Sequence, residues 1–596
     1  MLNLDSYSVE DLLLKRRSLH RQLSAVEGLR ELRVAVLGGS STNELVNLLE
    51  LHLLSSGFRP VFYTSEYGRF YEEAVHDVQA LFDFKPEIIY LHTSYRNVEN
   101  LPPLSCTEED LPSYISAELK RYRAIWDSLE RIANCQIIQN NFEMPPHALL
   151  GNMDAAASAG ASRFYMLLNM AFAQEAAQRP RLFLQDVHGL SARIGLRHWF
   201  DWNRYWSYKL LLMPDANLEL TRSLTSIIKA MFGRSSKVLV LDLDNTLWGG
   251  VIGDDGVDRI QIGRETAVAE AYTAFQEYCL SLRNRGILLA ICSKNEDEIA
   301  KSGLNHPSSI LKLEHFSCFK ANWRPKHENI REIAEELSLG IDSFVFVDDN
   351  PAEREIVRSQ VPAVAVPDVG SDVTRYAEII ERGRYFEPAA LLREDLQRAE
   401  LYASNSRRQT EQSRFATYGE YLDSLEMTAE IDRFKPVYLE RIAQLTNKTN
   451  QFNLTTRRYT PSEISTVADD ANHIGIYGKL GDRFGDNGLV SVVLGSVKAS
   501  ELHIDLWLMS CRVLKRDMET AMLDVLVARA KEKQLDSIVG YYFPTVKNGM
   551  VADHYEKLGF IPKSTYEIPG SSVWSLVIKD YQPRNRHIRI LEPING

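Results

Sequence analysis

The chain has 596 residues, 45% of them hydrophobic and 25% charged, which is enough for about three or four domains. Its net charge of −12 argues against a nucleic acid or an anionic membrane as principal partner. No apolar run approaches the roughly 18 residues of a membrane span, and the first residues carry acids where a signal peptide is apolar. Six scattered cysteines without C-x-x-C spacing disfavour zinc and a disulfide framework. We therefore expect a cytoplasmic protein.

The N-terminal part predicts an α/β sheet. An amphipathic helical pattern runs to about Glu27, and the apolar run from Leu32 enters the loop Gly38-Gly-Ser40, which a second helical pattern follows. Further apolar strands at residues 87–92 and 136–138 continue the sheet to about residue 230.

This part resembles a degenerate SGNH-hydrolase domain, and the resemblance places Ser40 at the nucleophile position. Asn141, Asp186 and His188 are candidates for the remaining roles. The expected Gly-Asp-Ser reads Gly-Gly-Ser, and the usual Asp-x-x-His spacing is absent. A structural or carrier-docking domain therefore stands as the alternative to a working hydrolase.

The next part begins with an apolar strand at Val238, which ends in Asp242-Leu-Asp244-Asn-Thr246. Strand alternation predicts both carboxylates on one side, at the carboxyl end of the strand, where a cation and a phosphate can sit. This is the pattern of phosphotransfer enzymes with an aspartate nucleophile. The alternative is an acidic turn after a core strand.

Three further elements follow in the order that such a site requires. A second apolar strand ends in Ser293-Lys-Asn295, the loop 322–326 offers Lys326, and a third strand ends in Asp348-Asp349. Because Cys292 precedes Ser293 on one strand, its side chain should point into the core. We expect Mg2+ at an all-oxygen site beside phosphate. Its predicted ligands are Asp242, Asp244, Asp348 and Asp349.

Each polar group of this site has a predicted role. Asp242 would attack phosphorus, Asp244 would protonate the leaving oxygen, and Lys326 would offset charge on the transferring group. The side chains expected to hold the phosphoryl oxygens are Thr246, Ser293 and Asn295.

The motifs Trp248-Gly-Gly-Val-Ile-Gly-Asp-Asp-Gly and Phe346-Val-Asp-Asp-Asn-Pro-Ala-Glu-Arg-Glu355 resemble the FkbH-like branch of the haloacid dehalogenase superfamily. The stretches between the four elements are too short for a large cap domain, which favours a macromolecular substrate such as a carrier protein. The resemblance implies that the glyceryl group of 1,3-bisphosphoglycerate, a small phosphorylated substrate, loses phosphate. Its acyl group is then loaded onto the pantetheine thiol of an acyl carrier protein.

The C-terminal part, from about Thr428, predicts an α+β fold. Asn548, Tyr555 and Gly559-Phe560 resemble the closing signature of GNAT acyltransferases. The stretch 512–519, where that family holds coenzyme A, lacks glycines, which counts against coenzyme A.

Cys511 lies at the expected end of a strand, beside Arg512 and just before a helix start, which would lower the pKa of its thiol. A thiolate there could accept the glyceryl group and pass it to the carrier. A small buried cysteine is the alternative. The basic doublets Arg407-Arg408 and Arg457-Arg458 are candidates for carrier docking, and a solvated helix face is the alternative for each.

We therefore expect a multidomain α/β protein with a Rossmann-like haloacid dehalogenase core. The predicted domains are an SGNH-like domain at 1–232, a phosphatase domain at 233–385, a helical linker at 386–427 and a GNAT-like domain at 428–596. Its predicted function is Mg2+-dependent dephosphorylation coupled to glyceryl transfer in polyketide-type biosynthesis. The alternatives are a phosphatase of another metabolite whose GNAT domain uses acyl-coenzyme A, and a non-catalytic loading scaffold.

Overall fold

The structure, a computed structural model, describes residues 4, 7–132, 135–391, 396, 398, 400–402, 408, 415–449, 451–510, 513–545, 547–564 and 570–591. The chain divides into two compact units, Met1–Lys229 and Ala230–Gly596. Among the helices of these described residues, none combines the length and the apolar character needed to cross a bilayer.

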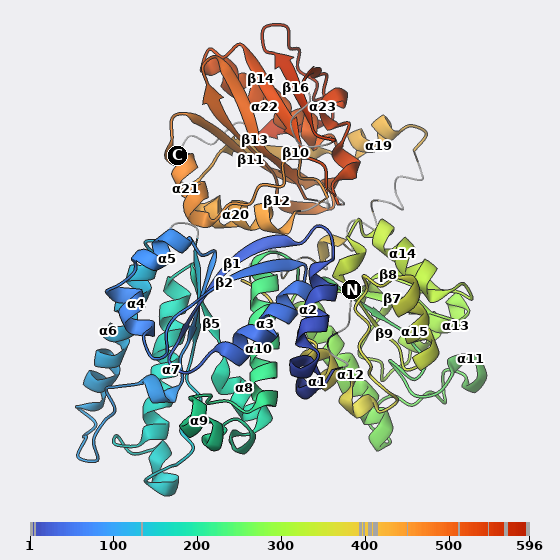
Figure 1. Ribbon diagram of the computed structural model, residues 1–596. Coiled ribbons are helices and arrows are strands. Elements are labelled where there is room, and N and C mark those ends of the chain that lie inside the picture. Colours follow the sequence, from blue (N-terminus) through green and yellow to red (C-terminus); the bar gives the residue numbers. More distant parts are fainter. Residues whose placement is uncertain are drawn as a thin grey trace. The chain divides into compact units, whose positions relative to one another are not determined.

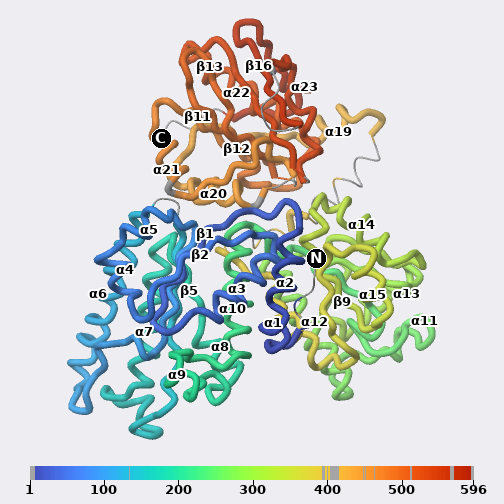
Figure 2. The backbone as a smooth tube through the Cα atoms, viewed as in Figure 1, coloured from blue at the N-terminus to red at the C-terminus, as the bar shows by residue number. Residues whose placement is uncertain are grey.

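The first unit contains a five-stranded parallel sheet of order β2-β1-β3-β4-β5 (Figures 1 and 2). Its strands are β1 (Arg30–Gly38), β2 (Phe58–Thr64), β3 (Ile88–His92), β4 (Gln136–Asn140) and β5 (Leu182–Gln185). Its longer helices are α2 (Arg16–Ser24), α3 (Asn43–Ser55), α6 (Leu111–Leu129), α7 (Ala161–Gln178), α8 (Val187–Ile194) and α10 (Pro214–Met231).

Helices α6 and α7 cover one face of this sheet. Ile89 and Leu91, two positions apart on β3, share a cluster with Trp126 of α6 and Phe172 of α7. The predicted single N-terminal helix is interrupted at Lys15, between α1 (Val9–Leu14) and α2. The sheet positions the carboxyl ends of β1 and β3 side by side, with Gly38 paired to His92.

The second unit begins with a four-stranded parallel sheet of order β8-β7-β6-β9. Its strands are β6 (Val238–Leu241), β7 (Leu288–Ser293), β8 (Phe316–Ala321) and β9 (Phe344–Val347). Every residue of β6 is buried because helices cover both faces. Leu239 and Leu241 pack with α12 (Ala267–Asn284) and α16 (Tyr376–Arg382). On the other face, Val238 and Val240 pack with α14 (Lys326–Glu336) and α15 (Pro351–Gln360).

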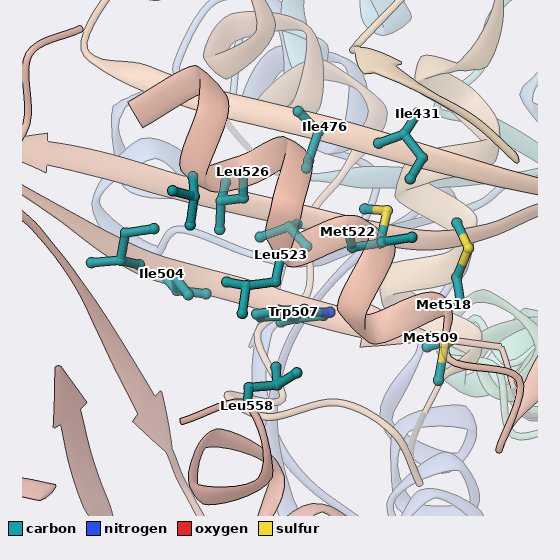
Figure 3. Packing of buried hydrophobic residues seen from close by; sticks show 14 of the residues in the cluster. Ile431, Ile476, Ile504, Trp507, Met509, Met518, Met522, Leu523, Leu526 and Leu558 are labelled. Carbon is teal, nitrogen blue, oxygen red and sulfur yellow. The ribbon is translucent and has the colours of Figure 1, made fainter. Parts of the chain in front are cut away.

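The C-terminal part of this unit holds an eight-stranded, mostly antiparallel sheet of order β15-β16-β14-β13-β12-β11-β10-β17. Its strands are β10 (Met427–Arg433), β11 (His473–Asp482), β12 (Gly485–Lys498), β13 (Glu501–Met509), β14 (Ser537–Tyr542), β15 (Ile561–Ser564), β16 (Ser572–Val577) and β17 (Ile588–Leu591). Helix α22 (Met518–Glu532) packs on one face, where Met522 and Leu526 meet Ile504 and Trp507 (Figure 3). Helices α20 (Leu439–Lys448) and α21 (Pro461–Asp469) pack on the other face.

The α/β multidomain architecture with parallel sheets is confirmed. The exact domain boundaries stay a prediction, and most of the predicted linker at 386–427 falls outside the described residues. After β14, the chain forms a 3-10 turn, Gly549–Val551, and the short helix α23 (His554–Lys557).

Candidate active site

Three parallel strands bring the predicted acidic residues to one edge of the four-stranded sheet. Leu241, the last residue of β6, pairs with Ile291 of β7 and with Val347 of β9. Asp242, Ser293 and Asp348 therefore emerge together at the carboxyl ends of neighbouring strands. Sites of open α/β sheets form at this edge.

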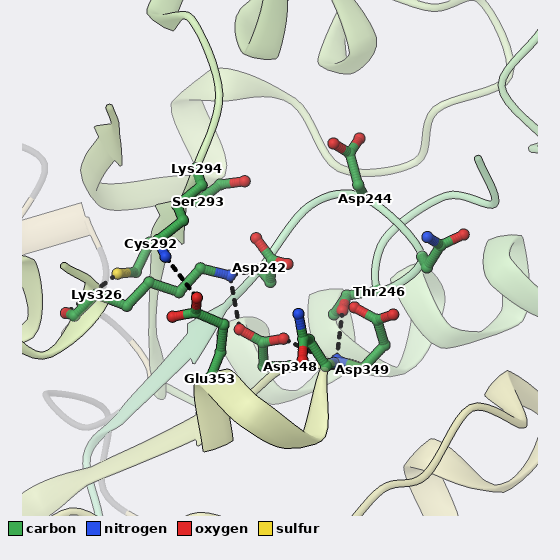
Figure 4. A network of polar contacts seen from close by, with 12 residues as sticks. Asp242, Asp244, Thr246, Cys292, Ser293, Lys294, Lys326, Asp348, Asp349 and Glu353 are labelled. Atoms are coloured by element: carbon green, nitrogen blue, oxygen red, sulfur yellow. Dashed lines mark hydrogen bonds and ion pairs between the residues drawn. The ribbon is translucent and has the colours of Figure 1, made fainter. Parts of the chain in front are cut away.

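Lys326, at the start of α14, connects two of these carboxylates. Its Nζ lies 3.0 Å from Oδ2 of Asp242 and 2.6 Å from Oδ2 of Asp348 (Figure 4). Lys326 is 3% exposed and Asp348 is fully buried, so the ion pairs are shielded from water. Burial opposes the charge on Lys326, but Asp242 and Asp348 outweigh it and raise the pKa of the ammonium. The cation therefore stays charged inside the site.

Asp242, Asp348 and Asp349 form a group that can hold a metal ion. Each offers a carboxylate oxygen, and these oxygens lie within 4.8 Å of one another. Burial, and then the charge of Asp242, raises the pKa of Asp348 to about 6 and also raises that of Asp349. Oδ1 of Asp242 is buried without a hydrogen-bond partner among the described residues. An orphaned anionic oxygen among three carboxylates fits a hard divalent cation such as Mg2+.

Asp244 lies outside this group, and its carboxylate points away from Asp348 and Asp349 (Figure 4). It accepts hydrogen bonds from Trp248 Nε1 at 2.9 Å, from the Ile252 amide at 3.0 Å and from Asn295 Nδ2 at 2.9 Å. Strand alternation does not reach it, because β6 ends at Leu241 and Asn245 has a left-handed φ of 53°. The structure thus gathers three of the four predicted metal ligands and turns the fourth carboxylate toward Asn295.

The predicted phosphate-binding side chains are buried close to these acids. Oγ1 of Thr246 accepts from the Asp349 amide at 3.3 Å, and Asn295 Nδ2 lies 3.3 Å from Oγ of Ser293. As predicted, Cys292 points into the core behind the sheet. Burial raises the pKa of its thiol, so it is no nucleophile.

Arg354 has a role that sequence reasoning missed. Its guanidinium donates to the backbone carbonyls of Asp348 and Asp349, at 2.8 and 2.7 Å, and pairs with Asp368 at 2.5 Å. It therefore fixes the loop that carries two candidate ligands. The only signal was its place in the Asp-Asp-Asn-Pro-Ala-Glu-Arg motif, which gave it no role by itself.

The candidates of the C-terminal part meet different outcomes. Cys511 lies outside the described residues. Asn548 is fully buried, and its amide donates to the carbonyls of Asn453 and Phe543, at 2.9 and 3.0 Å. Tyr555 is 1% exposed and packs on Gly540, where a Cβ would approach its ring to 2.3 Å. Both side chains hold the fold locally.

Other candidates occupy positions that limit their predicted roles. Arg408 is 2% exposed and paired with Asp482 at 2.6 Å, so its own side chain is not available to a carrier, and Arg407 lies outside the described residues. Asp186 caps α8 by accepting from the Gly189 amide, and its other partner is Asn141 at 2.8 Å. It does not orient His188, whose Nδ1 is buried without a partner among the described residues.

One solved structure is similar to a large part of this chain. It is the N-terminal part of the protein BF1531 from Bacteroides fragilis, containing a phosphatase domain complexed with Mg. The sequences are 30% identical, the TM-score is 0.58, and the match covers 63% of this chain and 99% of that chain. No protein-family model and no curated protein matches the chain.

Acetyltransferase structures match a shorter stretch. The ribosomal-protein-S18-alanine N-acetyltransferase from Escherichia coli is 11% identical, covering 25% of this chain and 94% of that chain with a TM-score of 0.21. Ard1 from Thermoplasma volcanium is 16% identical, covering 25% and 97%, also with a TM-score of 0.21. Likenesses this weak carry no argument about activity.

Proposed function

Since the chain belongs to the family of the Bacteroides fragilis phosphatase-domain protein, we propose that its acidic site is an Mg2+-dependent phosphatase. One observation carries this proposal. Asp242, Asp348 and Asp349 converge at the carboxyl ends of parallel strands, and Lys326 pairs with two of them. A cluster of three carboxylates around one ammonium retains excess negative charge, which suits a cation and then a phosphate.

Asp242 is the nucleophile. One of its carboxylate oxygens attacks phosphorus, the ester bond of the substrate breaks, and Asp244 donates a proton to the leaving oxygen. Water then attacks the aspartyl phosphate, and Asp244 takes the proton from that water. The residues that would hold Mg2+ are Asp242, Asp348 and Asp349. When bound, Mg2+ supplies positive charge beside the transferring phosphoryl group.

Asn295 links the acid to the phosphate-binding loop. Its amide contacts both Asp244 and Ser293, so one side chain fixes the proton donor relative to the hydroxyl that faces phosphate. Lys326 remains charged and offsets charge on the transferring group. These contacts support the assigned roles.

At finer detail, the family is FkbH-like within the haloacid dehalogenase superfamily, with an SGNH-like N-terminal and a GNAT-like C-terminal domain. The substrate derives from 1,3-bisphosphoglycerate, and the glyceryl group is loaded onto the thiol of an acyl carrier protein. The short element α11 (Ile252–Asp255) and helix α12 are all that lies between Trp248 and β7. A site without a large cap supports access for a carrier-borne arm.

The acyl-coenzyme A alternative meets an obstacle in the C-terminal sheet. The parallel strands β13 and β14 pair only over Glu501–His503 and Ser537–Val539. Beyond that point, residues 452–454 fill the opening: Leu454 donates to Trp507 O at 3.1 Å and accepts from the Phe543 amide at 2.9 Å. A ligand that binds between these strand ends must displace that segment. The scaffold alternative leaves the buried carboxylate cluster without a purpose.

The first test measures phosphate release from 1,3-bisphosphoglycerate made in situ, with holo acyl carrier protein and an Mg2+ titration. We expect turnover that disappears with chelator and returns with Mg2+. Mass spectrometry of the carrier measures glyceryl loading independently of phosphate release.

Phosphate release and the carrier adduct together distinguish the glyceryl-loading enzyme, a phosphatase of another metabolite and a non-catalytic scaffold. Phosphate release without any carrier adduct supports a phosphatase of another metabolite. If no phosphorylated substrate is turned over at any Mg2+ concentration, the scaffold remains and the phosphatase proposal fails.

A further inference from the structure

Helix α9 (Trp202–Tyr208; Figure 1) carries aromatic and basic side chains that the proposed phosphatase does not use. Residues 187–213 hold six aromatic residues and four Arg or Lys against one acid, in a chain whose net charge is −12. That acid, Asp201, caps α9 by accepting from the Arg204 amide at 3.0 Å, and Arg204 itself pairs with Glu44. The stretch is therefore locally basic and aromatic within an acidic protein.

Helix α9 packs at the carboxyl ends of β1 and β3. Ser41, which follows β1, donates from its amide to the Lys209 carbonyl and from its hydroxyl to the Tyr208 carbonyl, both at 2.9 Å. Arg96, in the turn after β3, donates from Nε to the Tyr205 hydroxyl at 2.9 Å. Open α/β sheets bind their partners at this edge. The helix therefore lies where binding by the first unit is expected.

The interior of this edge has no room for a small molecule. The pocket under the segment 208–212 has a volume of about 10 Å3, which holds at most one water molecule. Ser40 and His92 line it and are 5% and 7% exposed. Binding at this edge without rearrangement must therefore take place on the outer surface of α9.

Two cations lie over the rings of α9. The guanidinium carbon of Arg96 lies 4.6 Å from the ring centre of Tyr205 and 5.5 Å from that of Trp206. Nζ of Lys209 lies 5.3 and 5.5 Å from the same two centres. In the part of the chain that the structure describes, neither cation pairs with a carboxylate. A contact of this kind is worth about 0.5 to 1 kcal/mol at an exposed site, so it holds each charge in place without neutralising it.

The outer side chains of α9 are exposed to solvent. Trp206 is 63% exposed and Tyr208 is 70% exposed, whereas Tyr205 is buried. Exposing an indole ring leaves a large apolar area in water. Trp, Tyr and Arg are also the residues that contribute most to binding at protein interfaces. The composition therefore favours a protein partner, and the two positive charges favour an acidic one.

The contacts that support these side chains are already formed in the free protein. Lys209 ends α9 with a left-handed φ of 61°, and its amide donates to the Tyr205 carbonyl at 2.8 Å. The ring of Phe200 lies 5.2 Å from that of Trp202 and 5.5 Å from that of Tyr95. A surface that is fixed in advance loses less conformational entropy when a partner binds.

We propose that Arg96, Trp206, Tyr208 and Lys209, which we call the α9 face, form the docking surface for an acidic carrier protein. The identity of this partner rests on the proposed glyceryl loading. Carboxylates of the carrier pair with Arg96 and Lys209, and an apolar side chain of the carrier packs on Trp206. Because opposite charges attract over a distance, the α9 face also speeds association at low salt.

Single-stranded nucleic acid is the competing occupant, because it also binds aromatic rings and cations. Its binding needs a basic groove that follows several successive phosphates. Arg96 and Lys209 lie over the same two rings, so their positive charge is compact rather than extended. The α9 face therefore suits a few carboxylates on a protein surface better than a nucleic acid strand.

The test measures binding of a fluorescently labelled holo acyl carrier protein to the full chain by anisotropy. Trp206→Ala and Lys209→Glu should each weaken binding by at least about tenfold, because they remove the exposed aromatic contact and reverse one charge. Raising NaCl from about 50 to about 500 mM should weaken binding by the wild type more than binding by Lys209→Glu. The thermal midpoint of each variant checks that it is folded.

Matched controls on the same unit are Leu149→Ala, at a side chain that is 78% exposed, and Lys120→Glu, at an exposed lysine of α6. Both should bind the carrier with wild-type affinity. Wild-type affinity of Trp206→Ala and Lys209→Glu overturns the proposal, as does a wild type that does not bind the carrier. Tighter binding of labelled single-stranded DNA, lost in Trp206→Ala, also overturns it.

Phosphate release by the wild type without carrier is measured separately. A protein that releases phosphate but binds the carrier independently of Trp206 refutes the docking surface and leaves the phosphatase standing. A protein that binds the carrier through Trp206 but releases no phosphate supports the docking surface and refutes the phosphatase.

Discussion

At the residue scale, Asp242 combines two properties that are separable by mutation. It is the proposed nucleophile and also one of three neighbouring carboxylates, two of which pair with Lys326. Asp242→Asn removes the nucleophile, so phosphate release should fall by at least about a thousandfold. Without metal, the thermal midpoint should not fall, because the amide relieves repulsion with Asp348 and Asp349.

Phosphate release and thermal unfolding without Mg2+ check both parts of this prediction. Asp127→Asn, at an exposed aspartate of α6 paired with Arg179, is the matched control and should change neither value by much. Turnover by Asp242→Asn within about tenfold of the wild type would contradict the assignment.

Glu143 predicts a pH dependence of stability. It is 2% exposed, Oε1 lacks a partner among the described residues, and burial raises its pKa to about 8. Between the unfolded pKa near 4.5 and about 8, the native state therefore holds a proton that the unfolded state has released. Stability from this group is complete below that window and is lost as the pH rises through it.

Glu143→Gln stays neutral at every pH and should remove this loss. The variant should match the wild type at about pH 4.5 and exceed its free energy of unfolding by more than about 2 kcal/mol at about pH 9. Urea unfolding of the full chain at both values measures the difference. An equal shift at both pH values would mean that the proton of Glu143 is not responsible.

At the element scale, the strand ends were predictable, and the loops beyond them were not. Apolar runs ending in Asp242 and Asp348 indicated where chemistry would gather, because parallel strands share a carboxyl edge. The direction of Asp244 could not be predicted, because β6 stops before it and contacts from Trp248 and Ile252 decide. The alternation of side chains between the two faces holds only as long as the chain remains a β-strand.

The loop between β9 and α15 provides an element-scale prediction. Arg354 contacts two backbone carbonyls and Asp368 at once, and lysine lacks the planar fork that spans them. Arg354→Lys should raise the Mg2+ concentration for half-maximal phosphate release and lower the maximal rate by about tenfold. Arg358→Lys, one turn later on α15, is the control because Arg358, among the described residues, bonds Val366 O and Glu355 and neither aspartate carbonyl. Equal Mg2+ dependence of both variants would contradict this.

At the scale of the whole molecule, the sequence predicted parallel α/β parts followed by an α+β part. The sheets at 30–185 and 238–347 are parallel, and the sheet from Met427 is mostly antiparallel. The filling of the opening between β13 and β14 by residues 452–454 was not predictable, because such pairing depends on contacts distant in sequence.

Two separate chemistries on one chain predict that single variants separate them. Cys511→Ala should leave phosphate release within about twofold of the wild type, because the proposed phosphatase mechanism assigns no role to Cys511. If Cys511 accepts the acyl group, the same variant should form no glyceryl adduct on the carrier. Cys106→Ala, at a buried cysteine of the first unit, is the matched control and should load the carrier normally. Intact-protein mass spectrometry of the carrier measures loading by both variants. Normal loading by Cys511→Ala would exclude a covalent role for this thiol.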